Sequence, residues 1–520
     1  MGAKSNADAV SVRPTILARE PRKTPHGVAR DAGLPEPHSR PNAGFPRVGS
    51  PAVFFSKVWK FAAALLAAAS AGAAEPVAAT IESAVARALR ENRELLRLAA
   101  AHEAALLDLE SADAEFDLRV RPDGGIAAAG DAQTRQLGLL LLRKTEWGAQ
   151  LELGARALQT DADGDRHRRT VRAAIRQPLF RYAGREINRE EAARAEGRIR
   201  AALRRLELAK NDLALRVAQA YYDIYRLEEQ ARLEQAAVER LGALRRLAEI
   251  RARQGRATAV DALRVAAQEG EAAARARAVR ERAAARRLEL AEWMALPPDT
   301  PLDLAPPPLT VPEAPSLEEA LAAARANRLD LAQLEDDVGE VRRGARIARR
   351  RALPDLRLVA SIERSGGGDG PMAGGLEETR WTIGLQTDGD WGGRRERLAA
   401  RRAELDEATA LDDLDSARQR IEREVRERHR ALESALAETA PAQRQRDLAE
   451  TRLRLARRLF EMGRGDPFGV SDAEQQFQQA EAAMLAARIE AVLADYRLRR
   501  ETGMLIETLD ALKPRRAPSP

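Results

Sequence analysis

Few side chains in this sequence have the types and spacing that catalysis needs. The chain has no cysteine and only five scattered histidines, which excludes thiolate chemistry and leaves no histidine pattern typical of metal sites. No nucleophile–base pair stands out, and the glycine-rich run at 366–370 lacks the lysine and the helix that a phosphate-binding loop requires. The sequence therefore predicts a protein that is not an enzyme and has no cofactor or metal.

The candidate functional residues are instead acids that follow glycine breaks between long helical segments. Gly255 precedes Asp261, and Gly463 precedes Asp472. Acids near a helix N-terminus complement the helix dipole. Symmetry-related copies of Asp472 at the mouth of a cyclic oligomer would instead form an acidic ring that favours cations. Both interpretations stay open.

These breaks belong to a pattern that occurs twice. Residues 81–95 recur as 317–331, and each copy continues into β-like segments, a glycine turn and a long charged helix that ends at Gly255 or Gly463. A tandem duplication of this kind predicts two structural repeats with the same architecture. We expect the first repeat at 75–296, a proline-rich linker at 297–315 and the second repeat at 316–505.

The composition is typical of long helices. Charged residues make up 32% of the chain and aromatic residues 4%, and the 86 basic and 80 acidic residues leave a net charge of only +6. Along the long helices both signs are interleaved at i, i+4 spacing, which suits solvated helix faces. No basic patch separates from the acids there, so we expect no nucleic-acid partner.

The N-terminus predicts export. Residues 1–51 are expected to be disordered or to reflect an over-extended start. In 52–74, Lys57 and Lys60 precede an apolar run and small residues, which is typical of a signal peptide; a buried alanine-rich helix is the alternative. The run is too short to span a bilayer.

Within the repeats, hydrophobic periodicity predicts the elements. The first repeat should contain a helix, strands within 118–178, and long helices at 185–253 and 258–294. The 4–3 spacing of apolar residues predicts a coiled-coil seam on the first long helix, at Leu213, Val217, Ala220, Ile224, Leu227 and Ala231. This helix would be about 100 Å long, so it must bridge an aqueous distance.

The second repeat should follow the same order. We expect a helix capped by Ser316 and Glu319, strands within 355–387, and long helices at 394–462 and 470–505, with a disordered tail at 506–520. Pro441 should kink or break the long helix. Open sheet edges are not allowed in lipid, so several chains must contribute strands to one closed barrel. Trp147 and Trp381 would then belong to an aromatic girdle or pack inside the barrel.

Over residues 78–505 the sequence resembles the TolC-like outer-membrane factor family. The resemblance rests on the duplication, the signal peptide, the helix-tip glycines, Asn92 and Asn327 in the repeat openings, and the Gln-Pro-Leu-Phe segment at 177–180. It implies a mainly α fold with a transmembrane β-barrel portion. Four strands from each chain, or more because the first strand region is long, would complete the barrel in a homotrimer. The long helical hairpins would form an α-helical barrel.

The resemblance also implies a function. Such proteins are outer-membrane exit ducts of tripartite efflux pumps or type I secretion systems. They contact outer-membrane lipid, extend through the periplasm, and receive cargo from an inner-membrane pump through a periplasmic adaptor. A periplasmic coiled-coil scaffold without a pore is the alternative, although a scaffold would not need strands in both repeats.

The family pattern gives these residues roles at the periplasmic end. Asp472 matches an acid of the closed aperture, and Asp261 matches the acid that begins the first returning helix. Phe460 stands where the family has a tyrosine, and Arg464 lies beside the position of a family arginine. Gly255 and Gly463 mark the helix tips that would contact the adaptor.

Overall fold

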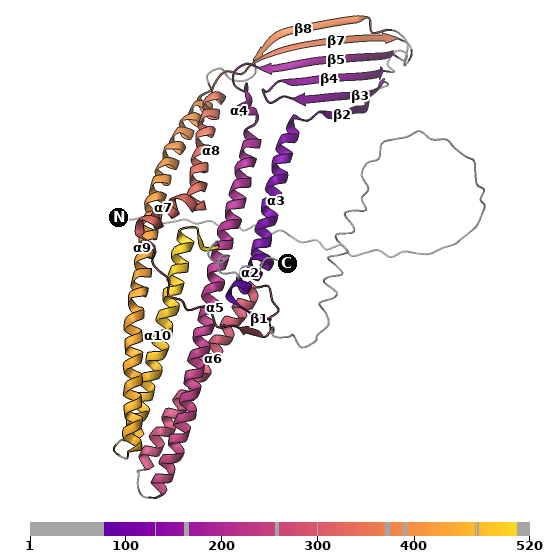
Figure 1. Ribbon diagram of the computed structural model, residues 1–520. Helices are drawn as coiled ribbons and strands as arrows, with labels where there is room; N and C mark the ends of the chain where they lie inside the picture. The colour runs from indigo at the N-terminus through magenta and orange to yellow at the C-terminus, as the bar shows by residue number, and fades with distance from the viewer. Residues whose placement is uncertain are drawn as a thin grey trace, which may run out of the picture. The chain divides into compact units, whose positions relative to one another are not determined.

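The computed structural model describes residues 77–506, apart from gaps at 130–131, 161–165, 255–258, 299, 369, 371–374, 388–392, 463 and 465–466. This part of the chain is mainly helical, as the sequence predicted, and carries a six-stranded sheet at one end (Figure 1). The predicted signal peptide and residues 1–51 lie outside the described residues.

The elements follow the duplicated order. The first repeat consists of β1 (Val77–Ala79), α2 (Ile81–Glu91), α3 (Arg93–Asp113), the 3-10 helix η2 (Ala114–Phe116), β2 (Arg119–Ala129), β3 (Ala132–Lys144), β4 (Gln150–Thr160), β5 (Arg166–Pro178), α4 (Arg185–Asn188), α5 (Glu190–Arg253) and α6 (Ala259–Trp293). The second consists of β6 (Leu302–Leu304), α7 (Leu317–Asn327), α8 (Leu329–Arg351), β7 (Leu356–Gly368), β8 (Glu378–Thr387), α9 (Arg394–Glu461) and α10 (Pro467–Glu501).

The first helix of each repeat, α2 or α7, is capped and ends after three turns. Ser316 caps α7 in a reciprocal capping box with Glu319, as predicted. The chain then breaks at Asn92 in the first repeat and at Arg328 in the second, where the sequence predicted continuous helices. The Asn92 side chain accepts the N–H groups of Glu94 and Leu95 and so begins α3 as an N-cap. Arg328 makes no such cap.

The structure also differs from the prediction at Arg189 and at Pro441. The helix expected at 185–253 is interrupted at Arg189, whose guanidinium pairs with Glu146 at 2.7 Å and Asp113 at 3.2 Å. Pro441, which was expected to kink or break the long helix, does not break it, because α9 continues through this residue. Buried Leu432 and Leu453 lie on either side of it. Their packing outweighs the cost of one proline, about 3 kcal/mol in a helix interior.

The predicted coiled-coil seam is confirmed. All six of its residues on α5 are buried. Beside them, Tyr221 and Tyr222 are fully buried, and Tyr221 fastens the end of the short parallel pair of β1 and β6 to α5. The Tyr221 hydroxyl lies 2.8 Å from the Ala79 carbonyl oxygen and 2.6 Å from that of Ala305. The linker expected at 297–315 therefore contains a strand.

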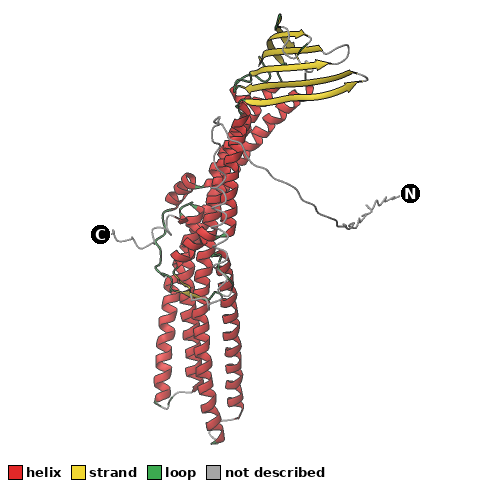
Figure 2. Cartoon of the chain, turned by 90° about the vertical axis from the view of Figure 1, so that its right-hand side faces the viewer, coloured by secondary structure: helices red, strands yellow, loops and turns green. Residues whose placement is uncertain are grey.

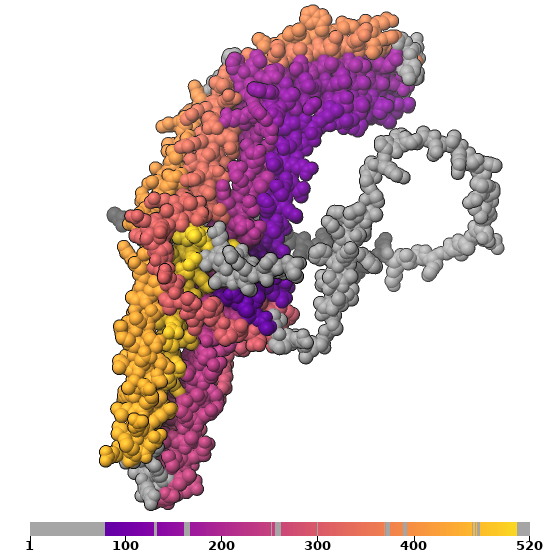
Figure 3. Space-filling view, viewed as in Figure 1, coloured from indigo at the N-terminus to yellow at the C-terminus, as the bar shows by residue number. Residues whose placement is uncertain are grey.

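The helices form two long hairpins. α5 and α6 make one, α9 and α10 make the other, and the two lie side by side to their tips (Figures 2 and 3). At the opposite end, α3, α5, α8 and α9 lead to the sheet (Figure 1). Among the described residues, no helix combines the length and the apolarity needed to cross a membrane.

The sheet is antiparallel throughout, in the order β2-β3-β4-β5-β7-β8. The first repeat contributes four of these strands and the second two. The question left open by the sequence is thereby answered: the long region 118–178 forms two hairpins, β2 with β3 and β4 with β5.

Candidate functional site at the helix tips and the sheet

The structure places the predicted tip residues where the two hairpins end. Asp472 lies in α10, beyond its first turn, with its side chain more than half exposed. Arg464 is exposed in the connection between α9 and α10, and its backbone N–H donates to the Leu459 carbonyl at 3.0 Å. Phe460 and Asp261 belong to α9 and α6, but their side chains are outside the described part of the structure.

The two tip glycines, Gly255 and Gly463, also lie outside the described residues.

The position of Asp472 in its helix helps to decide whether this acid complements the helix dipole or faces an aperture. The dipole effect falls off within the first turn of a helix, and the first turn of α10 contains no acid. Asp261 is in the first turn of α6, where a dipole role fits.

Asp472 is held by a partner on the neighbouring helix. Arg452 of α9 places Nη2 2.7 Å from Asp472 Oδ2. Gln476, one turn further along α10, donates from Nε2 to the same oxygen at 3.3 Å and also contacts Arg452. This polar triad joins the two helices of the second hairpin just above its tip.

Sequence reasoning missed Glu474, which joins the two hairpins to each other. Its Oε2 atom lies 2.9 Å from Nε of Arg240 on α5, and its Oε1 atom lies 2.9 Å from Nη2 of Arg457 on α9. Beside it a groove of about 820 Å³ runs between the hairpins, lined by Leu241 and Gln478 among others. Nothing in the sequence pairs Glu474 with an arginine so distant along the chain.

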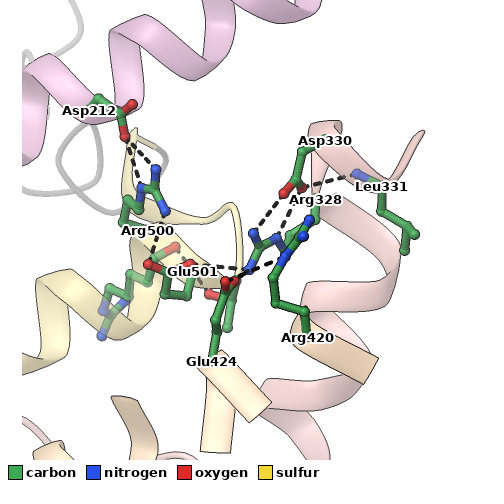
Figure 4. Close-up of polar contacts among 10 residues, drawn as sticks. Asp212, Arg328, Asp330, Leu331, Arg420, Glu424, Arg500 and Glu501 are labelled. Carbon is green, nitrogen blue, oxygen red and sulfur yellow. Dashed lines mark hydrogen bonds and ion pairs between the residues drawn. The ribbon is translucent and has the colours of Figure 1, made fainter. Parts of the chain in front are cut away.

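A second charge network lies at the break between α7 and α8 (Figure 4). The mostly buried Arg328 pairs with Asp330 at 2.7 Å, Glu424 at 2.9 Å and Glu501 at 3.1 Å. Arg500 pairs with Glu501 at 2.9 Å and with Asp212 of α5 at 2.8 Å. The network thus connects α5, α8, α9 and the end of α10. Within the described ranges, no cluster of histidine or acidic residues has the arrangement of a metal site.

The two faces of the sheet differ in chemistry. Successive side chains on a strand point to opposite faces, so the register assigns each residue to one face. One, here called the apolar face, carries exposed hydrophobic side chains on every strand. They include Val120, Leu137, Leu139, Leu151, Leu153, Val171, Ile175, Leu358, Ile362, Trp381, Ile383 and Leu385.

The opposite face, here called the polar face, carries most of the charge of the sheet. Its basic residues with described side chains are Arg119, Arg121, Lys144, Arg156, Arg168, Arg172, Arg176, Arg357 and Arg380. Its acidic residues are Asp123, Glu152, Glu363 and Glu378. Of the two tryptophans singled out from the sequence, Trp381 is exposed on the apolar face, and Trp147 is exposed in the turn before β4.

Comparisons with known proteins agree with this architecture. Residues 320–504 match the model of a family described as outer membrane efflux protein. No curated protein sequence matches the chain.

Among solved structures, the outer membrane protein VceC of Vibrio cholerae is similar, with a TM-score of 0.62 and 17% identity, covering 81% of this chain and 96% of that one. The CmeC outer membrane channel of Campylobacter jejuni has a TM-score of 0.61 and 13% identity, covering 82% of this chain and 86% of its own. The open-state MtrE outer membrane channel of Neisseria gonorrhoeae has a TM-score of 0.60 and 18% identity, and the match covers 82% of this chain and 89% of that one.

These comparisons agree with the outer-membrane location that the sequence predicted. The resemblance is confirmed: residues 320–504 match the outer membrane efflux protein family, and the chain shares the fold of solved outer-membrane channels.

Proposed function

We propose that this chain is the exit duct of an efflux or secretion system, built from three copies in the outer membrane of a Gram-negative bacterium. The two-faced sheet carries the proposal. An exposed apolar face on all six strands suits lipid, and a charged face opposite it suits water. The sheet stands on helices long enough to cross a wide aqueous space, since the 64 residues of α5 span about 96 Å.

Lipid requires that the sheet close. β2 and β8 are its edges, and unpaired backbone groups are not tolerated in hydrocarbon. Because the number of strands is even and each pair is antiparallel, β8 of one copy and β2 of the next run in opposite directions and can pair. Three copies would then form one barrel of eighteen strands, more than the twelve that four strands from each chain would give.

The widths of the sheet and of the helices beneath it support this closure. Six strands spaced about 4.8 Å apart and tilted by about 40° occupy about 38 Å of a barrel's circumference. The four helices that lead to the sheet, packed about 9–10 Å apart, occupy about 36–40 Å. A threefold assembly of this chain can therefore pass from strands to helices without a change in radius.

At the other end of the duct, we assign the periplasmic aperture to the region of Asp472, Asp261, Arg464 and Phe460. The tips at Gly255 and Gly463 would contact a periplasmic adaptor, which connects the duct to an inner-membrane pump. The pairing of Glu474 with both hairpins supports this assignment, because breaking its contact with Arg240 would let the hairpins separate. The pair of Asp472 with Arg452 holds the two helices of the second hairpin together at the same end.

The test uses the mature chain, purified in detergent. A mass corresponding to three copies, together with ion conductance in planar bilayers, is expected. A periplasmic coiled-coil scaffold would instead be a water-soluble protein without conductance, and that result would overturn the proposal. A scaffold also leaves the apolar face of the sheet without an explanation.

A further inference from the structure

The polar face of the sheet has an excess of positive charge. Nine basic and four acidic side chains with described positions lie on it, which leaves five positive charges on each chain. The chain as a whole is nearly balanced, with a net charge of +6 on 520 residues. The excess is therefore concentrated on one surface.

Some of these cations are neutralised locally. Arg156 pairs with Asp123 at 2.6 Å, and Arg176 pairs with Glu152 at 3.0 Å. At the helical end of the sheet, Lys144 pairs with Glu115 at 2.9 Å. The first two contacts pair Asp123 and Glu152, two of the four acids of the face, with basic residues, and they leave other arginines uncompensated.

Four exposed arginines have no carboxylate of the described residues within 4.0 Å: Arg121, Arg168, Arg172 and Arg380. Three of them lie on one row across the sheet. The register aligns Arg121, Leu140, Gly154, Arg172, Glu363 and Arg380 from β2 to β8. Glu363, the acid of this row, lies between two arginines and cannot balance three charges.

We propose that the polar face lines the pore and makes this duct selective for anionic solutes, such as those carrying carboxylate, phosphate or sulfate groups. The inference rests on the proposed function, because only a closed barrel turns the polar face into a pore lining. Guanidinium groups are permanently charged and bind carboxylate and phosphate oxygens. Rings of arginine or lysine side chains give pores their anion preference.

The size of such a pore is compatible with this effect. An eighteen-strand barrel of this tilt has a backbone radius of about 18 Å, and the arginine side chains extend into that space. In about 0.1 M salt the Debye length is about 10 Å, so much of the interior lies within range of the wall charges. The selectivity should weaken as salt is raised.

The experiment uses the full-length protein in a planar bilayer and applies charged probes from the side of the barrel. Because the long polar helices stay in the chamber of addition, the barrel opens to the opposite chamber. Inositol hexakisphosphate is the polyanionic probe in that opposite chamber, and spermine is the polycationic probe. The test variant combines Arg121→Gln, Arg172→Gln and Arg380→Gln. The control combines Arg135→Gln, Arg143→Gln and Arg364→Gln, which removes the same charge from the other face of the same sheet.

We expect inositol hexakisphosphate to block the wild-type current from the barrel side, and spermine not to. The test variant should require at least tenfold more of the polyanion, whereas the control should behave as the wild type. Equal block of the wild type and the test variant would overturn the inference, as would stronger block by spermine. A chain that forms no conducting trimer would overturn the proposed function itself, which distinguishes the two failures.

Discussion

Arg452 on α9 and Asp472 on α10 form an ion pair of 2.7 Å just above the tip of the second hairpin. The sequence singled out Asp472 as an acid whose charge would favour cations at a narrow mouth. The structure adds that a cation of the same chain lies against this carboxylate. Any field that Asp472 projects into an aperture is therefore reduced by Arg452.

This pair makes two variants informative. Asp472→Ala should lower the cation preference of the aperture, because it removes the carboxylate and leaves Arg452. Arg452→Gln should raise the preference, because it uncovers the carboxylate. Reversal potentials measured in a salt gradient across a planar bilayer will show both changes. If neither variant moves the reversal potential, Asp472 has only a structural role in its helix.

Glu474 should keep the two hairpins together. Glu474→Gln removes the charge that attracts both Arg240 and Arg457, so the tips should separate more readily and the open fraction of single channels should rise. Glu490→Gln is the matched control, since Glu490 on the same helix pairs, among the described residues, only with Arg497 of that helix. Similar open fractions for the two variants would show that the link between hairpins does not restrain the tips.

Arg328 should matter more for stability than its sequence context suggests. Its side chain is only 10% exposed and neutralises Asp330, Glu424 and Glu501. Arg328→Met would remove the cation that these three carboxylates share, although Glu501 keeps Arg500, and losing one partner of a buried pair costs about 3–5 kcal/mol. Thermal unfolding followed by circular dichroism should therefore show a clear fall in Tm. For the exposed Arg420, 3.8 Å from Glu424, Arg420→Met should change Tm little.

The link between α5 and α8 should weaken in acid. Hydrogen bonds from Arg200, at 2.8 Å, and from Arg204 hold the pKa of Asp336 below its ordinary value. Because the pKa is lower in the folded state, this carboxylate stabilises the fold above its unfolded pKa of about 4, and the contribution is lost as pH falls through the folded pKa. Partial exposure limits the contribution to less than about 1 kcal/mol.

The variant Asp336→Asn tests this sign. It should melt below the wild type at pH 7, and the difference should disappear near pH 3. Asp108→Asn, which removes a pair of 3.8 Å to Arg198, should melt like the wild type at both values. A difference that persists unchanged in acid would show that the carboxylate charge is not the cause.

The sequence predicted the long helices and their seam well, because the pattern of Leu213, Val217 and Ile224 repeats over many turns. It failed where a partner lies far along the chain. A helix pattern fixes which face is buried, but not the axial offset between two helices, so Glu474 could not be matched with Arg240. The break at Arg328 was also hidden, because its cause is a set of ion pairs and not a capping residue. The strands β1 and β6 are three residues each, too short to show alternation.

The orientation of the sheet can be tested with two neighbouring residues of β3. Leu139 lies on the apolar face and Leu140 on the polar face, so Leu139→Arg and Leu140→Arg place the same charge one residue apart on opposite sides. An arginine facing lipid near the midplane of a barrel costs about 2–4 kcal/mol, whereas one facing a water-filled interior is solvated. We therefore expect Leu139→Arg to reduce assembly into outer membranes, measured as the heat-resistant trimer on gels, and Leu140→Arg to assemble. If Leu139→Arg assembled and Leu140→Arg did not, lipid would lie against the arginine-rich face. That result would contradict both the proposed pore and its proposed anion selectivity.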